Sequence, residues 1–137
     1  MESMKSFRLD IEVRSTEIDI NGHVNNAKYL EYLEWGRGVW YEQSGLAIET
    51  LLSLGMQAVA VNININYRKE CRQGDKLTII TEAVRAGRTS YVLNQEIVNQ
   101  AGERCADAVI TSVAMDVHTR ASRPIPDLLR AQFPVLS

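Results

Sequence analysis

The sequence has 137 residues, of which 45% are hydrophobic and 23% are charged, and its formal net charge at pH 7 is −2. These values are typical of one soluble globular domain, and we expect a single domain over residues 1–137. A slightly acidic chain does not favour nucleic acid as a partner, because phosphate binding needs a concentrated positive field. No apolar run is long enough for a membrane span.

The N-terminal segment, MESMKSFRLD, lacks the apolar stretch of a signal peptide, so we expect a cytoplasmic protein. In a reducing compartment, Cys71 and Cys105 are expected to be free thiols. His23 and His118 lie far apart in the sequence, and neither belongs to a Cys/His cluster with metal-ligand spacing. The sequence therefore predicts no metal site and no cofactor.

The first predicted element is a strand over residues 7–14 (FRLDIEVR), where apolar and charged residues alternate. Residues 16–24 break this alternation with polar side chains and Gly22, which indicates a loop. This loop holds an Asp, an Asn and a His within five residues, immediately before a mostly apolar segment. Such a polar cluster at the entrance to a buried element is the first candidate for a functional site.

A long helix is predicted from about residue 25 to residue 44. Asn25 or Asn26 is suited to cap its N-terminus, and Gly45 is suited to end it. Most of its side chains are apolar or aromatic, so we expect the helix to be enclosed on most sides. Glycine is unfavourable inside a helix, so we expect close approach of another backbone at its interior glycines, Gly36 and Gly38.

The second half of the sequence predicts four strands, within residues 58–70, 74–87, 88–100 and 101–119. Short turns that contain glycine join the last three, which is typical of antiparallel hairpins. In the first of the four, strict alternation places these residues on one face: Val59, Val61, Ile63, Ile65 and Tyr67.

The predicted order is strand, long helix and four antiparallel strands, followed by a tail from Ser122 with a short helix near residues 127–132. A helix that is apolar on most sides is buried only where a sheet curls around it. The fold class is therefore α+β, with a curved antiparallel sheet wrapped around one long central helix, the hot-dog architecture. Such a sheet leaves a free edge, and edge-to-edge pairing into a homodimer or homotetramer would cover it.

Three segments resemble the signature segments of hot-dog thioesterases, and the resemblance covers most of the chain. They are VRSTEIDINGHVNNAKYLEYLEWGR (13–37), VAVNININYRKECRQGDKLTI (59–79) and CADAVITSVAMDVHTRAS (105–122). Together they are most similar to the bacterial long-chain acyl-CoA thioesterase III type. The segments DINGH and YRKEC instead resemble the acyl–acyl-carrier-protein thioesterases of plants, so the carrier on the substrate stays open.

The resemblance implies hydrolysis of long- or medium-chain acyl-CoA thioesters. The alternatives are a thioesterase for acyl-carrier-protein or aromatic acyl-CoA substrates, and an acyl-binding module without hydrolysis. Asp19 is expected to act as nucleophile or as general base on water. The unpaired N–H groups at a helix start suit a developing oxyanion, and we expect Asn25 and Asn26 to supply them from their backbones.

The same resemblance implies roles for residues that would otherwise be interpreted as turn or surface residues. His23 would orient the thioester carbonyl or the water, and Asn21 would contact substrate. Glu70 would orient water, with Cys71 as an alternative nucleophile. Tyr29 is interpreted as core or as part of an acyl channel.

A basic segment around Gly87 is the last candidate for substrate binding. Surface charge at a hairpin is its ordinary explanation. The family often presents this segment to the nucleotide end of CoA, and arginine suits phosphate well. The residues expected to bind substrate there are Arg85, Arg88 and Ser90, to which Arg120 and Arg123 would add.

Overall fold

The computed structural model of the protein describes residues 6–135, so the first five residues of the N-terminal segment MESMKSFRLD lie outside the described residues. No helix within this range is long and apolar enough to cross a lipid bilayer. The elements in chain order are β1 (Ser6–Glu12), the 3₁₀ helix η1 (Ser15–Glu17), α1 (Asn26–Gln43), α2 (Ile48–Ser53), β2 (Met56–Tyr67), β3 (Lys76–Ala86), β4 (Ser90–Val98), β5 (Arg104–Asp116) and α3 (Asp127–Arg130).

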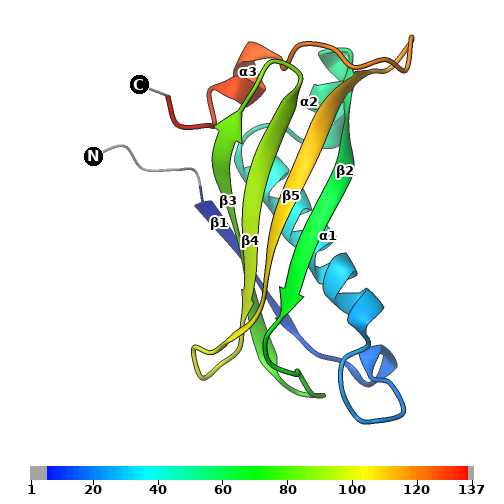
Figure 1. The fold of residues 1–137 in the computed structure, drawn as a ribbon, viewed down its shortest axis with the longest axis vertical. Coiled ribbons are helices and arrows are strands. Elements are labelled where there is room, and N and C mark those ends of the chain that lie inside the picture. Colours follow the sequence, from blue (N-terminus) through cyan, green and yellow to red (C-terminus); the bar gives the residue numbers. More distant parts are fainter. Residues whose placement is uncertain (1–5, 136–137) are drawn as a thin grey trace.

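The strands form one antiparallel sheet in the order β1-β3-β4-β5-β2, and α1 runs along one face of it (Figure 1). The predicted order of elements and the antiparallel hairpins are confirmed. The short helices η1 and α2 were not predicted. β1 and β2 form the two edges of the sheet.

The two ends of α1 follow ordinary capping chemistry. Asn25 is the N-cap, and its side-chain oxygen accepts a hydrogen bond from Ala27 N at 2.9 Å. Gly45 follows the helix with φ +75°, a left-handed conformation that favours glycine. Both predicted boundaries are confirmed.

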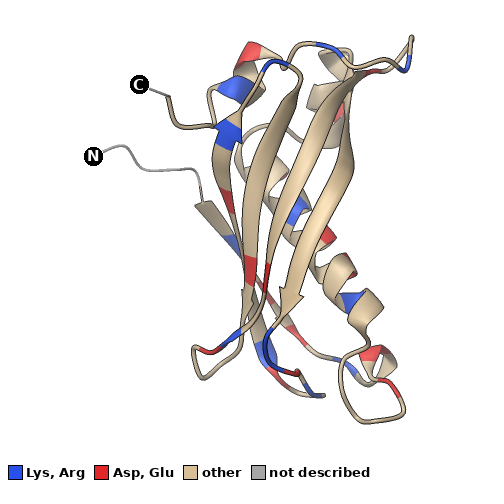
Figure 2. Cartoon of the chain, in the orientation of Figure 1, with Lys and Arg blue, Asp and Glu red and all other residues tan. Residues whose placement is uncertain are grey.

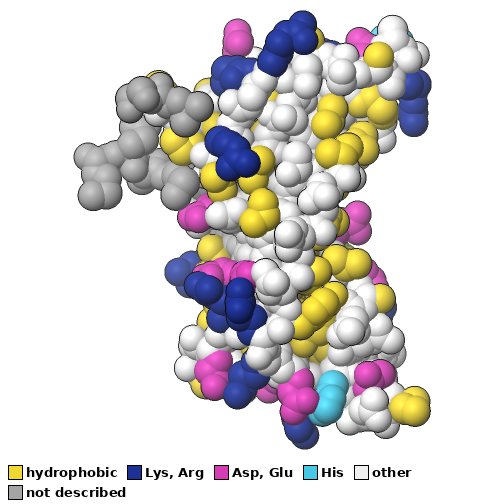
Figure 3. Space-filling view, viewed as in Figure 1, with side chains coloured by type: hydrophobic (Ala, Val, Ile, Leu, Met, Phe, Trp, Pro, Cys, Tyr) yellow, Lys and Arg dark blue, Asp and Glu magenta, His cyan; other side chains and the backbone are white. Residues whose placement is uncertain are grey.

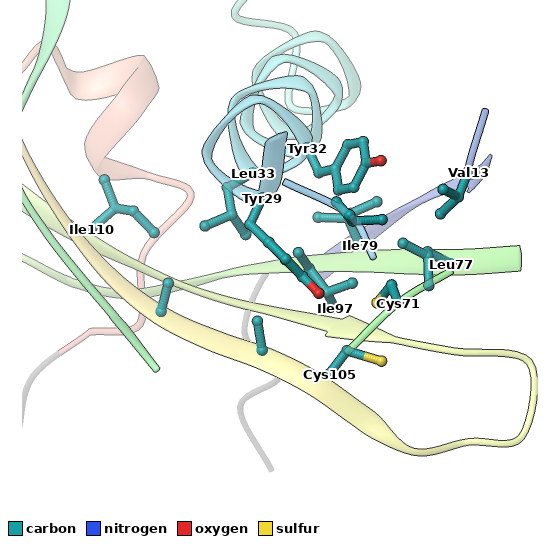
Figure 4. Close-up of a cluster of buried hydrophobic side chains, with 13 residues drawn as sticks. Val13, Tyr29, Tyr32, Leu33, Cys71, Leu77, Ile79, Ile97, Cys105 and Ile110 are labelled. Carbon is teal, nitrogen blue, oxygen red and sulfur yellow. The ribbon is translucent and has the colours of Figure 1, made fainter. Parts of the chain in front are cut away.

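The expectation that α1 is enclosed on most sides is wrong for the single chain. Its buried face packs on β1 and β3, where Tyr29, Tyr32 and Leu33 point toward the sheet (Figure 4). On its other side, Leu30 and Trp35 remain 40% and 38% exposed. The helix lies over one half of the sheet, so the half that ends in β2 has an uncovered inner face.

A bulge at Val61 decides which side chains of β2 face α1. The pairing of β2 with β5 shifts by one residue between Ala60 and Asn62. Such a shift moves the following side chains to the opposite face. The predicted apolar face is therefore wrong for Val59, which lies on the outer face. The residues of β2 on the inner face are Met56, Ala58, Ala60, Ile63, Ile65 and Tyr67.

The two interior glycines of α1 have different surroundings. A Cβ at Gly36 would lie 2.4 Å from Ile79 Cγ2 and 3.1 Å from Gln95 Nε2, so side chains of the sheet, rather than another backbone, require glycine there. A Cβ at Gly38 would meet no atom within 4 Å. The expectation of a close approach at Gly38 is therefore wrong within this chain.

This contrast predicts opposite effects of the same substitution. Gly36→Ala should lower the free energy of unfolding by about 1–3 kcal/mol, because overpacking forces Ile79 or the helix to move. The matched Gly38→Ala should raise it by up to about 1 kcal/mol, because alanine favours the helix and has room. Urea unfolding of both variants measures the difference, and equal effects would contradict the assignment.

Candidate active site

The loop before α1 is a tight turn closed by its own backbone. Ile18 and Val24 form an isolated antiparallel bridge, and Asp19 N donates to His23 O at 2.8 Å. Gly22 has φ +81° and donates from its N–H to Asp19 O at 3.1 Å. This geometry fixes the side chains of residues 19 and 23 next to the start of the helix.

The carboxylate of Asp19 has two different environments. Its Oδ1 accepts hydrogen bonds from the backbone N–H of Asn21 at 2.9 Å and of His23 at 3.2 Å. Within residues 6–135, no hydrogen bond reaches its Oδ2. One oxygen therefore holds the turn, as expected of an ordinary turn residue, and the other is available for chemistry.

A pocket of about 290 Å³ lies between this loop, the first turn of α1 and the end of β2. Five of the residues predicted for the site line it: Asp19, His23, Asn26, Tyr29 and Glu70. Four lining residues were not predicted for the site: Val24, Tyr67, Arg68 and Lys69. Val24 belongs to the loop itself, and the other three lie at the end of β2, which the folded sheet places beside the loop.

The backbone N–H of Asn26, at the start of α1, is free within the described residues. Asn25 N donates to Glu17 O at 3.0 Å, Lys28 N donates to Asn25 O at 2.8 Å, and the Asn25 side chain satisfies Ala27 N. Within the described range, Asn26 N has no acceptor. The expected oxyanion donor at the Asn25 backbone is therefore wrong, whereas Asn26 N is unbonded at the positive end of the helix dipole.

His23 and Glu70 form the charged side of the pocket. His23 Nε2 lies 3.0 Å from Glu70 Oε2, and Arg72 donates to Glu70 Oε1 at 2.8 Å. The hydrogen bond from Arg72 is the main cause that lowers the pKa of Glu70, and the charge of His23 acts in the same direction. Glu70 is thus held ionised beside His23, and it links the end of β2 to the loop.

A buried acid, Glu17, holds the start of α1 next to the loop. Its carboxylate accepts hydrogen bonds from Tyr32 Oη at 2.9 Å and Arg14 N at 3.0 Å. Burial alone would raise the pKa of Glu17, but these hydrogen bonds outweigh it and lower the pKa overall. Together with the bond from Asn25 N to its carbonyl, they tie α1 to the chain that enters the loop. Nothing in the sequence distinguishes Glu17 from an exposed acid.

Tyr29 and Tyr67 form the aromatic wall of the pocket. Their rings meet edge to face, with centroids 5.2 Å apart and an interplanar angle of 77°. Tyr29 is buried and forms a hydrogen bond with the thiol of Cys71, which points into the core (Figure 4). Burial raises the pKa of the Cys71 thiol, and Cys71 does not line the pocket. This arrangement argues against Cys71 as the nucleophile.

The remaining predicted residues lie elsewhere. Asn21 is exposed near the tip of the loop and contributes its backbone N–H, while its side chain does not line the pocket. Arg85, Arg88 and Ser90 lie at the hairpin between β3 and β4, at the opposite end of the sheet (Figure 1). That hairpin is roughly 30 Å from the site along β3, at the usual rise of a strand. Within one chain the structure does not bring them to the pocket.

Charged side chains occur at both ends of the sheet. Figure 2 shows Lys and Arg at the hairpin end, on β3 and α3, as well as near the pocket. Across residues 6–135, no three side chains of His, Cys, Asp or Glu converge in a way that would hold a metal ion. The pocket itself presents two carboxylates, an imidazole, two basic side chains and a free backbone donor.

Comparison with known proteins identifies relatives of this chain that are named as thioesterases. The long-chain acyl-CoA thioesterase FadM of Escherichia coli (strain K12) is 37% identical over 124 residues, which are 90% of this chain and 93% of that protein. The putative acyl-CoA thioesterase YneP of Bacillus subtilis (strain 168) is 30% identical over 78% of each chain. The crystal structure of YbaW, a probable thioesterase from Escherichia coli, superposes with a TM-score of 0.79 at 34% identity, over 91% of this chain and 94% of that one.

These similarities confirm the hot-dog fold and the thioesterase resemblance predicted from the sequence. The family model of the Thioesterase-like superfamily matches residues 13–133, nearly the whole described range. The chain therefore belongs to the Thioesterase-like superfamily.

Proposed function

We propose that this protein hydrolyses acyl-CoA thioesters of long or medium chain length to a free acid and CoA. One observation carries the proposal: a carboxylate with a free oxygen, Asp19, and an unbonded N–H at a helix start, Asn26, line the same pocket. The names of the relatives from E. coli and B. subtilis support the same reaction class.

The reaction places the thioester carbonyl oxygen at Asn26 N, where the helix start stabilises the negative charge that develops. Asp19 then acts by one of two routes. As a general base it takes a proton from water, whose oxygen attacks the carbonyl carbon while the C–S bond breaks. As a nucleophile it forms an acyl–Asp19 anhydride and releases CoA thiolate, and water then hydrolyses the anhydride.

His23 and Glu70 assist in this proposal by positioning. Glu70 holds the imidazole of His23 at the pocket wall, and His23 orients the attacking water or the carbonyl. A second candidate function is hydrolysis of acyl-carrier-protein thioesters, because the segment with Glu70 and Cys71 resembles those enzymes. Comparing the same acyl group on CoA and on carrier protein, by kcat/KM, distinguishes the two.

We further propose a cytoplasmic enzyme whose catalytic unit is the one hot-dog domain. Cys71 and Cys105 are both buried free cysteines, which suits a reducing compartment.

The free edge of β2 supports a homodimer as the working form. Val61, Ile63 and Tyr67 on this 12-residue edge strand are 57%, 38% and 47% exposed. A long edge strand with exposed apolar side chains is a template for pairing with a second copy. A homotetramer would require a second interface, for which the outer face of the sheet is the candidate.

Removing the carboxylate of Asp19 should abolish turnover. Asp19→Asn keeps an Oδ1 that can accept the N–H bonds of Asn21 and His23, so the loop stays folded while the base or nucleophile is lost. We expect kcat to fall by at least about a hundredfold, measured as CoA thiol release with a thiol reagent. The matched Asp10→Asn, on the exposed face of β1, should retain the wild-type rate. Near-normal turnover in Asp19→Asn would refute the mechanism, and acyl-CoA binding without turnover in the wild type would indicate a binding module.

Glu70→Gln should cause a partial loss, because His23 loses its charged partner but remains in the loop. We expect kcat/KM to fall roughly tenfold, because the imidazole of His23 is no longer held in place by a charged partner 3.0 Å away. Arg72→Gln removes the other partner of Glu70 without touching His23, and it should stay near the wild-type rate. An unchanged kcat/KM in Glu70→Gln would contradict a positioning role for Glu70 and leave it an ordinary surface residue.

The proposed dimer should dissociate when charge is placed on the β2 edge. We expect wild-type protein to sediment as a dimer or larger, and Val61→Lys to shift it toward monomer. The control Val109→Lys places the same charge on the outer face of β5, where Val109 is also exposed, and it should leave a β2-paired dimer intact. A monomeric wild type in sedimentation equilibrium would contradict the proposal.

A further inference from the structure

A second cavity lies at the other end of the seam between α1 and β2, and its role depends on the proposed function. The pocket at Asp19 is lined by Asn26 and Tyr29 of α1 and by Tyr67 of β2. The second cavity, of about 490 Å³, is lined by Gly38 and Tyr41 of α1, and by the start of β2. The same two elements therefore border both spaces.

The second cavity suits an alkyl group. Leu46 and Met56 are fully buried in its wall, and Leu51 is nearly so. The charged residues that also border it, Glu42 and Glu49, are exposed. An apolar wall with charge only near solvent accepts the methyl end of a chain and disfavours an anionic group.

On the β2 side, apolar side chains connect the two spaces, whereas α1 has the exposed Glu34 between Leu30 and Gly38. The inner face of β2 carries Ala60, Ile63 and Ile65 between them, and Leu30 of α1 is 40% exposed on the opposite side of the seam. Figure 3 shows hydrophobic side chains at the surface in the region of β2 and α1. The guanidinium of Arg37 on the same helix is bonded to Gln95 of β4 at 3.1 Å, so it is directed to the sheet.

Gly38 is the feature that packing within the chain leaves unexplained. Glycine inside a helix costs up to about 1 kcal/mol relative to alanine. A Cβ at Gly38 would meet no atom within 4 Å, and Gly38 lines the cavity. The space beside it is therefore kept open at the expense of helix stability, which a bound group in that space would account for.

The length of the seam matches a long acyl chain. Along α1, Gly38 lies about 18 Å beyond Asn26, at the usual rise of about 1.5 Å per residue. An extended alkyl chain advances about 1.25 Å per carbon, from ordinary bond lengths and angles. An acyl group whose carbonyl is at Asn26 thus reaches Gly38 after about 14 carbons.

We infer that the cavity beside Gly38 receives the methyl end of long-chain acyl groups, and that Gly38 sets which chain lengths fit. Chains of about 14 carbons reach its entrance, and longer chains fill it. Chains of eight carbons end within the seam and do not touch it.

Gly38→Leu tests this inference without removing any packing. Leucine favours the helix, and in the protein without substrate its side chain would extend into the cavity that Gly38 lines, so the variant should fold. We expect kcat/KM for hexadecanoyl-CoA to fall by roughly tenfold or more, because at least two methylenes lose their burial. For octanoyl-CoA it should stay within about twofold, since an eight-carbon chain ends before Gly38. Gly38→Ala, the matched control, should change the ratio of the two substrates little.

Binding measurements separate this inference from the proposed function. In the Asp19→Asn background, calorimetry with hexadecanoyl-CoA and octanoyl-CoA should show the same selective loss in Gly38→Leu. If the wild type hydrolyses no thioester but the selective loss of binding is found, the proposed function fails and the inference stands. An unchanged preference for chain length in both assays would overturn the inference. So would an equal loss for both substrates that accompanies a change in oligomeric state, because Gly38 would then serve a subunit contact.

Discussion

The contact of α1 with the sheet at Gly36 is the constraint on which the rest of the structure depends. With no side chain at Gly36, the helix backbone can approach Ile79 and Gln95. Gln95 Nε2 then bonds to Leu33 O and to Thr81 Oγ1, both at 2.8 Å, in the buried layer between helix and sheet. The buried amide of Gln95 is hydrogen-bonded to the helix and to the sheet, so it fixes both the position of the helix on the sheet and its distance from the sheet. The helix is thereby held over β1, β3 and β4.

That position leaves the inner face of β2 uncovered, and the candidate functional spaces follow from this. A helix centred on the sheet would close the seam along Ile63 and Ile65. Because α1 is offset, the seam between α1 and β2 has the pocket at Asp19 at one end and the cavity at Gly38 at the other. The free edge and the open seam belong to the same side of the molecule, so a subunit contact there would cover apolar surface and enclose a bound chain together.

The chemistry of the pocket arises from what the folded backbone leaves unsatisfied. Glu17 O, the side chain of Asn25 and its carbonyl accept hydrogen bonds from Asn25 N, Ala27 N and Lys28 N, and they leave Asn26 N free within the described residues. The turn uses one oxygen of Asp19 and leaves the other without a hydrogen bond within the described residues. A free acceptor and a free donor at the rim of one pocket are costly for stability and useful for catalysis, which is the usual pattern at active sites.

Local patterns predicted what depends on local chemistry. The alternation of apolar and polar residues predicted the strands, and Asn25 and Gly45 predicted the helix ends, because these signals act within a few residues. The bulge at Val61 and the offset of α1 were not predicted, since both result from pairing and packing between distant segments. For the same reason the segment 19–26 was identified, whereas Glu17 and Tyr67 were not, because their roles depend on contacts with residues of α1 that are distant in the sequence.

The position of Arg85, Arg88 and Ser90 can be understood only beyond the single chain. They lie at the hairpin end, whereas Asp19 lies at the other end of the sheet. Two β2 edges related by a twofold axis pair antiparallel, so each site end would lie on the same side as the hairpin end of the other copy. The proposed dimer therefore reverses the separation seen within one chain. A substrate whose apolar tail lies in the seam would then extend its polyanionic head toward the basic hairpin end of the second subunit. Pairing at the free edge of β2 would therefore suit the shape of an acyl-CoA, which has a long apolar tail and a charged head.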